Sequence, residues 1–483
     1  MQKIHFTHPP SLRTFFATEL WERYGFYVIQ TLLALYLVLH FQWPDKQVYV
    51  LVGSFTALTY ISPVVGGWIA DHLLGQKRAI LTGAVVLLLS YLAISLAVTD
   101  SHLTASLAGI AVGTGLLKPN ISSLLGNEYP VGDPNRERGF TIFYMGVTTG
   151  ILLGTTLPSY LNTYFGWNVS FASATIGMLI AITTFCVGIR QYGIRDYTPF
   201  QYQFKKIALA AFLMISLWFM SFYILNYPLF ADEIFITVAF LSMSYLLYCV
   251  KTEAKHQARK TMVILLLCVI SVMFWAFYFQ MFLSLILFIV RVVQPTLLGI
   301  PFTPPYYVGI QSIGMILFGI LLAGRQYKLS PTKQAMRTGN KFVLSMILTT
   351  IAYLLITLVS RLGAPSALLS PFYIIPTYLL FSMAELLLSP VGLSAITMLA
   401  SPKKVSTMMG IFFVSLGIGA FLSGKLAELT AISVGETSII DLKAHYAASF
   451  TQLLYILCCA TLVCVVLNLV IKYLMSRPLP EHE

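Results

Sequence analysis

The chain has 483 residues, of which 58% are hydrophobic and only 10% are charged, and its formal net charge is +12. Soluble domains carry about a quarter charged residues, so this composition excludes a soluble globular protein and indicates a chain that lies mostly in lipid. The basic residues fall in short loops between apolar runs, as in oriented membrane proteins, which argues against nucleic-acid binding.

The apolar runs have the length of membrane-spanning helices, about 20 residues each. The first half is predicted to hold six of them, at 14–40, 48–71, 78–98, 103–125, 139–163 and 168–189. Eight more are predicted at 206–225, 230–250, 262–290, 304–325, 341–361, 370–400, 407–430 and 446–475. We therefore expect an all-α integral membrane protein with 14 transmembrane helices.

Lysine and arginine gather in alternate loops, which predicts both termini on the cytoplasmic side of the cell inner membrane. The opposite loops hold only Lys46, Arg291, Arg361 and Lys443, with Lys425 near a helix end. The first apolar run is too long and too charged for a cleaved signal peptide, so we expect Met1 to be the mature end.

The helices divide as six, two and six, because basic linkers at 190–206 and 251–261 flank the middle pair. Two six-helix bundles are the architecture of major-facilitator transporters, which place substrate at the midplane between the bundles. We predict an N-terminal bundle at 1–190, a linker with two inserted helices at 191–260, and a C-terminal bundle at 261–483. The inserted pair is expected to face lipid without a role in transport.

Five ionisable side chains fall inside predicted spans, where each costs a few kcal/mol unless function or pairing explains it. They are Glu19, Glu22, Arg23, Lys118 and Glu385. The first three have i, i+3 and i+4 spacing and share one helix face, so we expect them to line a cavity as a proton switch with Lys118. The alternative to a proton switch is a static ion-pair network that only holds the first and fourth helices together. Glu385 is either a carboxylate for a substrate cation or a protonated acid bonded to a neighbouring helix.

The predicted spans offer few residues for proton transfer other than carboxylates, and few for catalysis or metal binding. All eight histidines lie in loops or at helix ends, so a proton site has to be a carboxylate. The sequence shows no group of residues that could act as nucleophile and base or bind a metal, so we expect neither an enzyme nor a metal or other cofactor. Protons are the expected coupling ion. A receptor is disfavoured because the chain has no sizeable soluble domain. Tyr27, Tyr60 and Tyr144 are candidates for cavity positions or for interface anchors.

Four segments carry a resemblance to a known family. Residues 19–27, ELWERYGFY, resemble the helix 1 signature of the proton-coupled oligopeptide transporter family, and residues 113–123 with 139–146 look like its second signature. Residues 274–280 and 376–393 are similar to further family segments in helices 7 and 10. Gly67 to Asp71, with Gly75, Lys77 and Arg78, looks like the major-facilitator conformational latch between helices 2 and 3.

The resemblance implies a bacterial di- and tripeptide permease that works by proton symport and alternating access, as a functional monomer in the lipid bilayer. It implies Glu22 as the principal proton site with Glu19 nearby. Arg23 and Lys118 would bind the peptide carboxylate, and Glu385 would bind the amino terminus. Further substrate-binding positions implied by the resemblance are Tyr27, Gln30, Tyr60, Tyr144, Thr148, Trp275, Gln280 and Gln311.

Some positions depart from the family pattern. Phe26 and Val28 stand where a tyrosine and a glycine are usual, and Thr148 and Gln311 stand where asparagines are usual. These changes remake hydrogen bonds to a peptide, so its side-chain preference stays open. The alternative function is a carrier of a different small solute, peptide-like or otherwise amphoteric, on the same proton-coupled fold.

Overall fold

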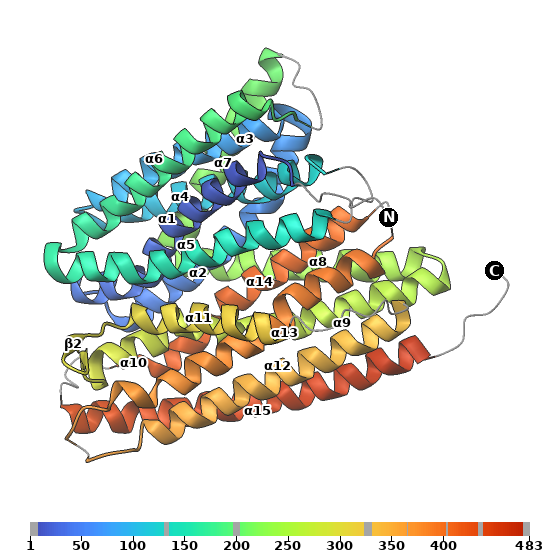
Figure 1. Cartoon of the computed structure of the whole chain (residues 1–483). Helices are drawn as coiled ribbons and strands as arrows, with labels where there is room; N and C mark the ends of the chain where they lie inside the picture. The colour runs from blue at the N-terminus through green and yellow to red at the C-terminus, as the bar shows by residue number, and fades with distance from the viewer. Residues whose placement is uncertain are drawn as a thin grey trace, which may run out of the picture. The chain divides into compact units, whose positions relative to one another are not determined.

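The computed structural model describes residues 8–129, 135–196, 203–322, 331–364, 366–401, 404–432 and 438–476. Eleven helical segments in this part of the chain are long and apolar enough to cross a membrane. α1 and α4, which carry the predicted ionic residues, and the shorter α11 bring the number to the predicted 14. The prediction of an all-α membrane protein is confirmed (Figure 1).

Residues 1–33 and 58–228 form one compact unit, called unit 1. Within it α3 packs against both α4 and α6, and α5 packs against α6. Its elements are α1 (Leu12–Leu39, whose last turns belong to the second unit), α2 (Asp45–Ile69, from Leu58 onward), the π-helix η1 (Ala70–Leu74), α3 (Gln76–Ser95), α4 (Asp100–Asn127), α5 (Asn135–Phe165), α6 (Trp167–Tyr192) and α7 (Phe204–Asn226).

Residues 34–57 and 229–483 form unit 2. α12 packs between α13 and α15, and Figure 1 shows α12 and α15 side by side. The elements are α8 (Pro228–Thr252), α9 (Lys255–Tyr278), η2 (Phe279–Phe282), α10 (Ser284–Val292), β1 (Thr296–Leu297), β2 (Ile300–Pro301), α11 (Pro305–Leu322), α12 (Pro331–Val359), η3 (Pro371–Tyr373), α13 (Ile375–Leu399), α14 (Val405–Ala427), η4 (Glu428–Thr430) and α15 (Ile439–Ser476).

The predicted helix at 262–290 is interrupted. A 3₁₀ turn over Phe279–Phe282 separates α9 from α10, and side chains compensate for the broken helix ladder. Gln280 donates to the Ser423 carbonyl at 2.7 Å, and the Ser284 hydroxyl donates back to the Gln280 amide oxygen at 2.6 Å. A two-stranded hairpin follows, in which Leu298 and Gly299 have the positive φ angles of a tight hairpin turn.

The two inserted helices fall in different units. In unit 1 the Trp218 indole of α7 donates to the Ala105 carbonyl of α4 at 3.1 Å, and α7 also packs on η1. α8 lies in unit 2, where its Asp232 pairs with Lys425 of α14 at 2.8 Å. The predicted domain boundaries at 190 and 261 stay predictions.

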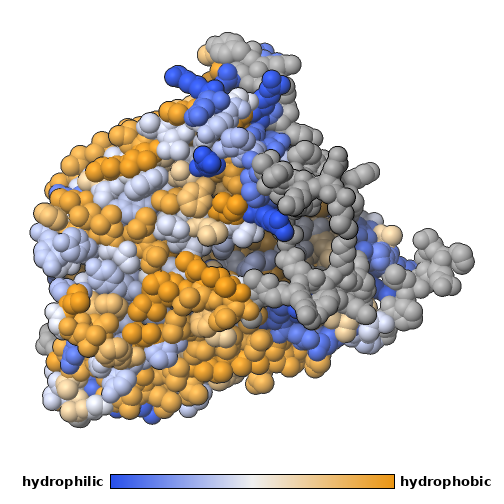
Figure 2. Space-filling model, viewed as in Figure 1, coloured by the Kyte–Doolittle hydropathy of each residue, from blue (hydrophilic) through white to orange (hydrophobic). Residues whose placement is uncertain are grey.

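Large hydrophobic side chains are exposed along the outer helices, as expected for surfaces in contact with lipid. On α7 and α8 they include Phe212, Ile236 and Phe240, which are 64 to 70% exposed. Figure 2 shows large areas of hydrophobic side chains on the face in view. The chain is a multi-pass membrane protein.

Candidate functional site

The predicted ionic face of α1 forms a buried cluster. Arg23 donates two hydrogen bonds to the Glu22 carboxylate, at 2.5 and 2.6 Å, and its Nε lies 3.4 Å from Glu19 Oε1. Glu22 is 0% exposed, and Glu19 and Arg23 are each 4% exposed. The second Glu19 oxygen is buried and has no hydrogen-bond partner in the described part of the chain. The cluster therefore holds one arginine against two carboxylates, with one oxygen left to accept a further hydrogen bond or a proton.

Lys118 of α4 joins this cluster through its charge, because it interacts electrostatically with Arg23, Glu22 and Glu19. Its ammonium group lies 4.5 Å from the centre of the Tyr60 ring, a cation–π contact. The predicted proton-coupling residues are thus brought together in unit 1, with Tyr60 beside them.

The local backbone explains why α2 approaches Lys118 closely. Pro119 has no N–H to bond to the Gly115 carbonyl one turn earlier in α4. Gly66 of α2 lies against that carbonyl, where a Cβ would come within 2.0 Å of its oxygen. The Asn120 amide bonds to the Leu116 carbonyl at 2.6 Å and reaches the Gly66 carbonyl at 3.4 Å. The Asn120 amide thus links α4 to the backbone of α2 directly after the proline.

α5 packs on the same stretch of α1 through three glycines at four-residue spacing. A Cβ at Gly146, Gly150 or Gly154 would come within 2.8, 2.3 and 2.6 Å of α1 carbonyl oxygens, respectively. Small residues allow such close approach of membrane helices. Gly150 contacts Arg23 itself, so the glycine row fixes the backbone behind the ionic cluster.

The remaining predicted residues of unit 1 differ in exposure. Tyr144 is 48% exposed, whereas Gln30 is buried and Tyr27 is half-buried. The Thr148 hydroxyl donates to the Tyr144 carbonyl of its own helix at 3.1 Å. Phe26, where the family has tyrosine, places its ring 5.1 Å from the Arg23 guanidinium carbon. This is a cation–π contact between the ring and the cluster.

Sequence reasoning missed Tyr91 of α3. Its ring lies against Gly25, where a Cβ would approach it within 2.8 Å, and it interacts electrostatically with Glu22 and Arg23. Its hydroxyl is buried without a hydrogen-bond partner among the described residues. Its place in the apolar run 78–98 does not distinguish it by pattern from the tyrosines of other predicted spans.

In unit 2, Glu385 is held by two side chains. The Tyr278 hydroxyl and the Gln311 amide both donate to Glu385 Oε2, the amide at 2.8 Å, and the amide also lies 3.0 Å from the Tyr278 oxygen. This arrangement holds the carboxylate between α9, α11 and α13 and tests neither predicted role of Glu385, as a carboxylate for a substrate cation or as a protonated acid bonded to a neighbouring helix, so both stay predictions. It also gives the predicted residue Gln311 a partner 74 positions away, and it adds Tyr278, which the sequence analysis did not single out.

Trp275 lies on α9 with Tyr278, and Gln280 lies in the 3₁₀ turn that follows. Trp275 is 3% exposed, its ring meets Tyr278 edge-on at 4.9 Å, and its indole N–H has no hydrogen-bond partner within the described ranges. Gln280 is 0% exposed, and its amide is occupied by Ser423 and Ser284. In this conformation Gln280 joins α14 to the 3₁₀ turn rather than facing open space.

The predicted latch residues surround the junction of η1 and α3. The π-helix ends at Gly75, whose φ of 77° favours glycine. The Lys77 backbone N–H donates to the Asp196 carboxylate at 2.8 Å, and its ammonium donates to the Ile194 carbonyl at 2.9 Å. Asp196, which sequence reasoning missed, thus caps the N-terminus of α3.

The other latch positions make different contacts. Gly67 of α2 lies beside Pro119 of α4, and the side chains of Asp71 and Arg78 are exposed. Among the described residues, no group of three or more His, Cys, Asp or Glu side chains could hold a metal ion.

A buried ion-pair cluster within the spanning helices of unit 1, and a buried hydrogen-bonded carboxylate within those of unit 2, are typical of a secondary transporter. The chain belongs to the POT family, whose profile (PTR2) matches residues 77–440. This family is a transporter family, and the resemblance predicted from the sequence is confirmed.

Curated relatives and solved structures agree with this assignment. Dipeptide and tripeptide permease A of Serratia proteamaculans is 32% identical over 456 residues, covering 93% of this chain and 88% of the relative. Dipeptide and tripeptide permease A of Klebsiella pneumoniae is 30% identical over 454 residues, covering 93% of this chain and 89% of the relative. A solved proton-dependent oligopeptide transporter superposes with a TM-score of 0.81 at 26% sequence identity, covering 97% of this chain and 99% of that structure. A tetrameric PepTSo2 structure superposes with a TM-score of 0.83 at 25% sequence identity, covering 96% of this chain and 99% of that structure.

Proposed function

We propose that this protein carries di- and tripeptides into the cytoplasm by proton symport through alternating access. The observation that carries this proposal is the fully buried Glu22–Arg23 pair, with Glu19 3.4 Å from the same guanidinium. The related permeases and the solved proton-dependent oligopeptide transporter support the substrate class.

The proton step follows from the hydrogen bonds of Arg23. A proton on Glu22 converts the carboxylate into a neutral acid and removes the charge that holds the guanidinium. Arg23 can then turn to another anion, and Glu19 is the other carboxylate within reach of it. A peptide carboxylate would compete for the same guanidinium and for Lys118, so proton binding and substrate binding favour each other.

The two ends of a peptide match different groups of the protein. Arg23 and Lys118 in unit 1 suit its carboxylate, and Glu385 in unit 2 suits its ammonium group. The ammonium group would replace donors that Tyr278 and Gln311 now supply to Glu385. We propose that Tyr27, Tyr60, Tyr144 and Trp275 supply ring faces and hydroxyls along the substrate, because aromatic side chains offer both.

The remaining elements of the proposal concern the membrane and the latch. We propose a location in the cell inner membrane with both termini cytoplasmic, because lysine and arginine alternate between the loops. We propose that Gly67, Asp71, Gly75, Lys77 and Arg78 act as a conformational latch, supported by the capping of α3 by Asp196. We propose a monomer as the working unit, because the predicted site residues all come from one chain, although one solved relative is described as tetrameric.

The test compares two transport modes in liposomes for wild type, Glu22→Gln and the control Glu428→Gln. Glu428 is also an acid but is 32% exposed, 3.9 Å from Lys425. We expect Glu22→Gln to lose uphill uptake of labelled dipeptide under an inward proton gradient while keeping exchange of dipeptide across the membrane. Uphill uptake by Glu22→Gln equal to wild type would show that Glu22 is not the proton site.

A further inference from the structure

α8 is fastened to the rest of unit 2 by ion pairs near its two ends. Near its start, Asp232 pairs with Lys425 of α14 at 2.8 Å. At its end, Glu253 pairs with Lys404, next to the start of α14, at 2.9 Å, and accepts a hydrogen bond from Thr261 of α9 at 2.5 Å. Hydrogen bonding to Glu253 raises the pKa of the Lys404 ammonium above its ordinary value, so Lys404 is charged at neutral pH.

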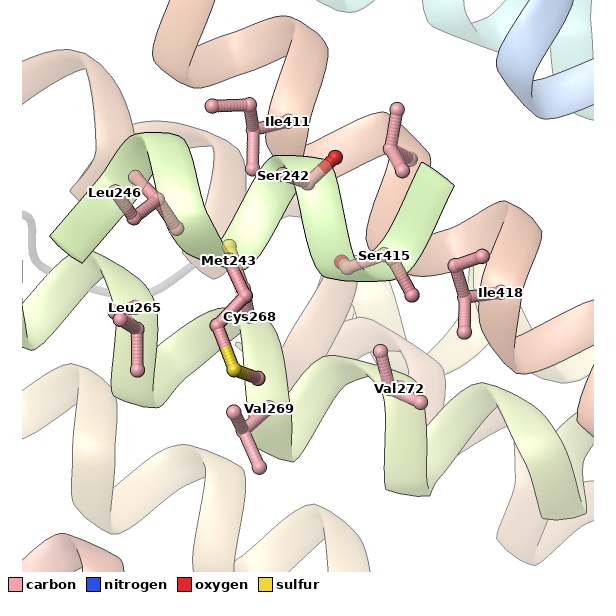
Figure 3. Close-up of a pocket in the computed structure, with 12 residues that line it drawn as sticks. Ser242, Met243, Leu246, Leu265, Cys268, Val269, Val272, Ile411, Ser415 and Ile418 are labelled. Atoms are coloured by element: carbon pink, nitrogen blue, oxygen red, sulfur yellow. The ribbon is translucent and has the colours of Figure 1, made fainter. Parts of the chain in front are cut away.

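Between these attachments α8 leaves a crevice of about 80 Å³ against α9 and α14. Figure 3 shows the side chains that line it, which are aliphatic or sulfur-containing apart from two serines. One of these, Ser415, already bonds to Ser271 at 3.0 Å and to the Phe412 carbonyl at 2.6 Å. The lining includes Met243, which is 47% exposed, so the crevice reaches the outer surface. An apolar ligand therefore suits it better than water.

One end of the crevice is close to a run of cations. Lys251, Lys255, Arg259 and Lys260 lie where α8 ends and α9 begins, and the acid among them, Glu253, is neutralised by Lys404. Leu246 and Leu265 of the lining are each five residues from the nearest of these cations, which is about 7.5 Å along a helix. Basic sites between membrane helices attract anionic headgroups.

We propose that the crevice between α8, α9 and α14 binds an acyl chain of an anionic phospholipid, with its phosphate at the basic α8–α9 junction. The geometry supplies both parts of such a site: an apolar slot open to the lipid side and net positive charge one to two turns away. The inserted helix then has a definite task, which is to hold a bilayer lipid against α9 and α14. This inference does not depend on the transported substrate.

The experiment is lipid retention measured by native mass spectrometry on protein released from nanodiscs of equal phosphatidylglycerol and phosphatidylethanolamine. Ser242→Phe fills the crevice, and Ser244→Phe makes the same change two residues away, outside the lining. We expect Ser242→Phe to lower retained phosphatidylglycerol by about tenfold, the effect of removing two methylenes from apolar burial, and Ser244→Phe to leave it unchanged.

A second pair of variants tests binding of the lipid headgroup without altering the crevice. Lys255→Gln with Arg259→Gln should lower the preference for phosphatidylglycerol by about 30-fold, since each cation contributes about fivefold. Lys205→Gln with Lys206→Gln, at the start of α7, is the control and should change nothing. Equal retention by Ser242→Phe and Ser244→Phe would overturn the proposal, as would a wild type without preference between the two lipids. If Ser242→Phe fails to fold, the headgroup pair decides alone.

Discussion

Replacing Arg23 with methionine should destabilise the protein more than any surface charge replacement, because it strands a buried carboxylate. Arg23 makes the two hydrogen bonds that Glu22 receives, at 2.5 and 2.6 Å, and Glu22 is 0% exposed. Removing one partner of a buried ion pair costs about 3 to 5 kcal/mol. The exposed pair Asp232–Lys425, whose side chains are about a third exposed, is the control, and Lys425→Met should cost less than about 1 kcal/mol.

The assay is reversible unfolding in mixed micelles by titration with denaturing detergent, carried out on a double-mutant cycle. Adding Glu22→Gln to Arg23→Met removes the stranded charge and should recover part of the loss, with an interaction energy above about 1 kcal/mol. Additive effects of the two substitutions would contradict this prediction, because the carboxylate and the guanidinium would then not depend on each other.

Three further outcomes follow from the contacts around the site. Gly150→Leu should cost about 1 to 3 kcal/mol and reduce uptake, because its Cβ would meet the Leu20 carbonyl at 2.3 Å, whereas Gly319→Leu, which meets nothing within 4 Å, should be silent in thermal unfolding. Asp196→Ala should lower stability by about 0.5 to 2 kcal/mol through loss of the α3 cap, and an equal effect of Asp71→Ala would contradict this. Glu385→Gln should raise the KM of peptides with a free amino terminus more than that of N-acetylated peptides; equal shifts would remove Glu385 from amine recognition.

The sequence predicts the helices and the ionic cluster well, because lipid imposes strong rules on both. A charge within an apolar run is conspicuous, and i, i+3 and i+4 spacing places Glu19, Glu22 and Arg23 on one face without any tertiary information. Lys118 stands out by the same rule. Its approach to Tyr60 depends on how α2 packs at Gly66, which spacing alone does not reveal.

Other features depend on contacts between distant residues. The break at Phe279–Phe282 lies within a mostly apolar run, and it is stabilised by Ser423, 143 positions from Gln280. Tyr91 and Tyr278 cannot be separated by pattern from the rest of the 27 tyrosines in the chain. The division of α7 and α8 between two units likewise follows from tertiary packing, such as the bond from Trp218 to Ala105, and has no signature in hydropathy.

Proton-coupled peptide transport is tested most directly by uptake of labelled dialanine by the purified protein in liposomes, with and without an inward proton gradient. We predict accumulation above the external concentration only with the gradient, and suppression of that accumulation by excess unlabelled di- and tripeptides. No dialanine uptake by protein that is folded and correctly inserted would contradict the assignment of peptides as the substrate, and accumulation that ignores the proton gradient would contradict proton coupling.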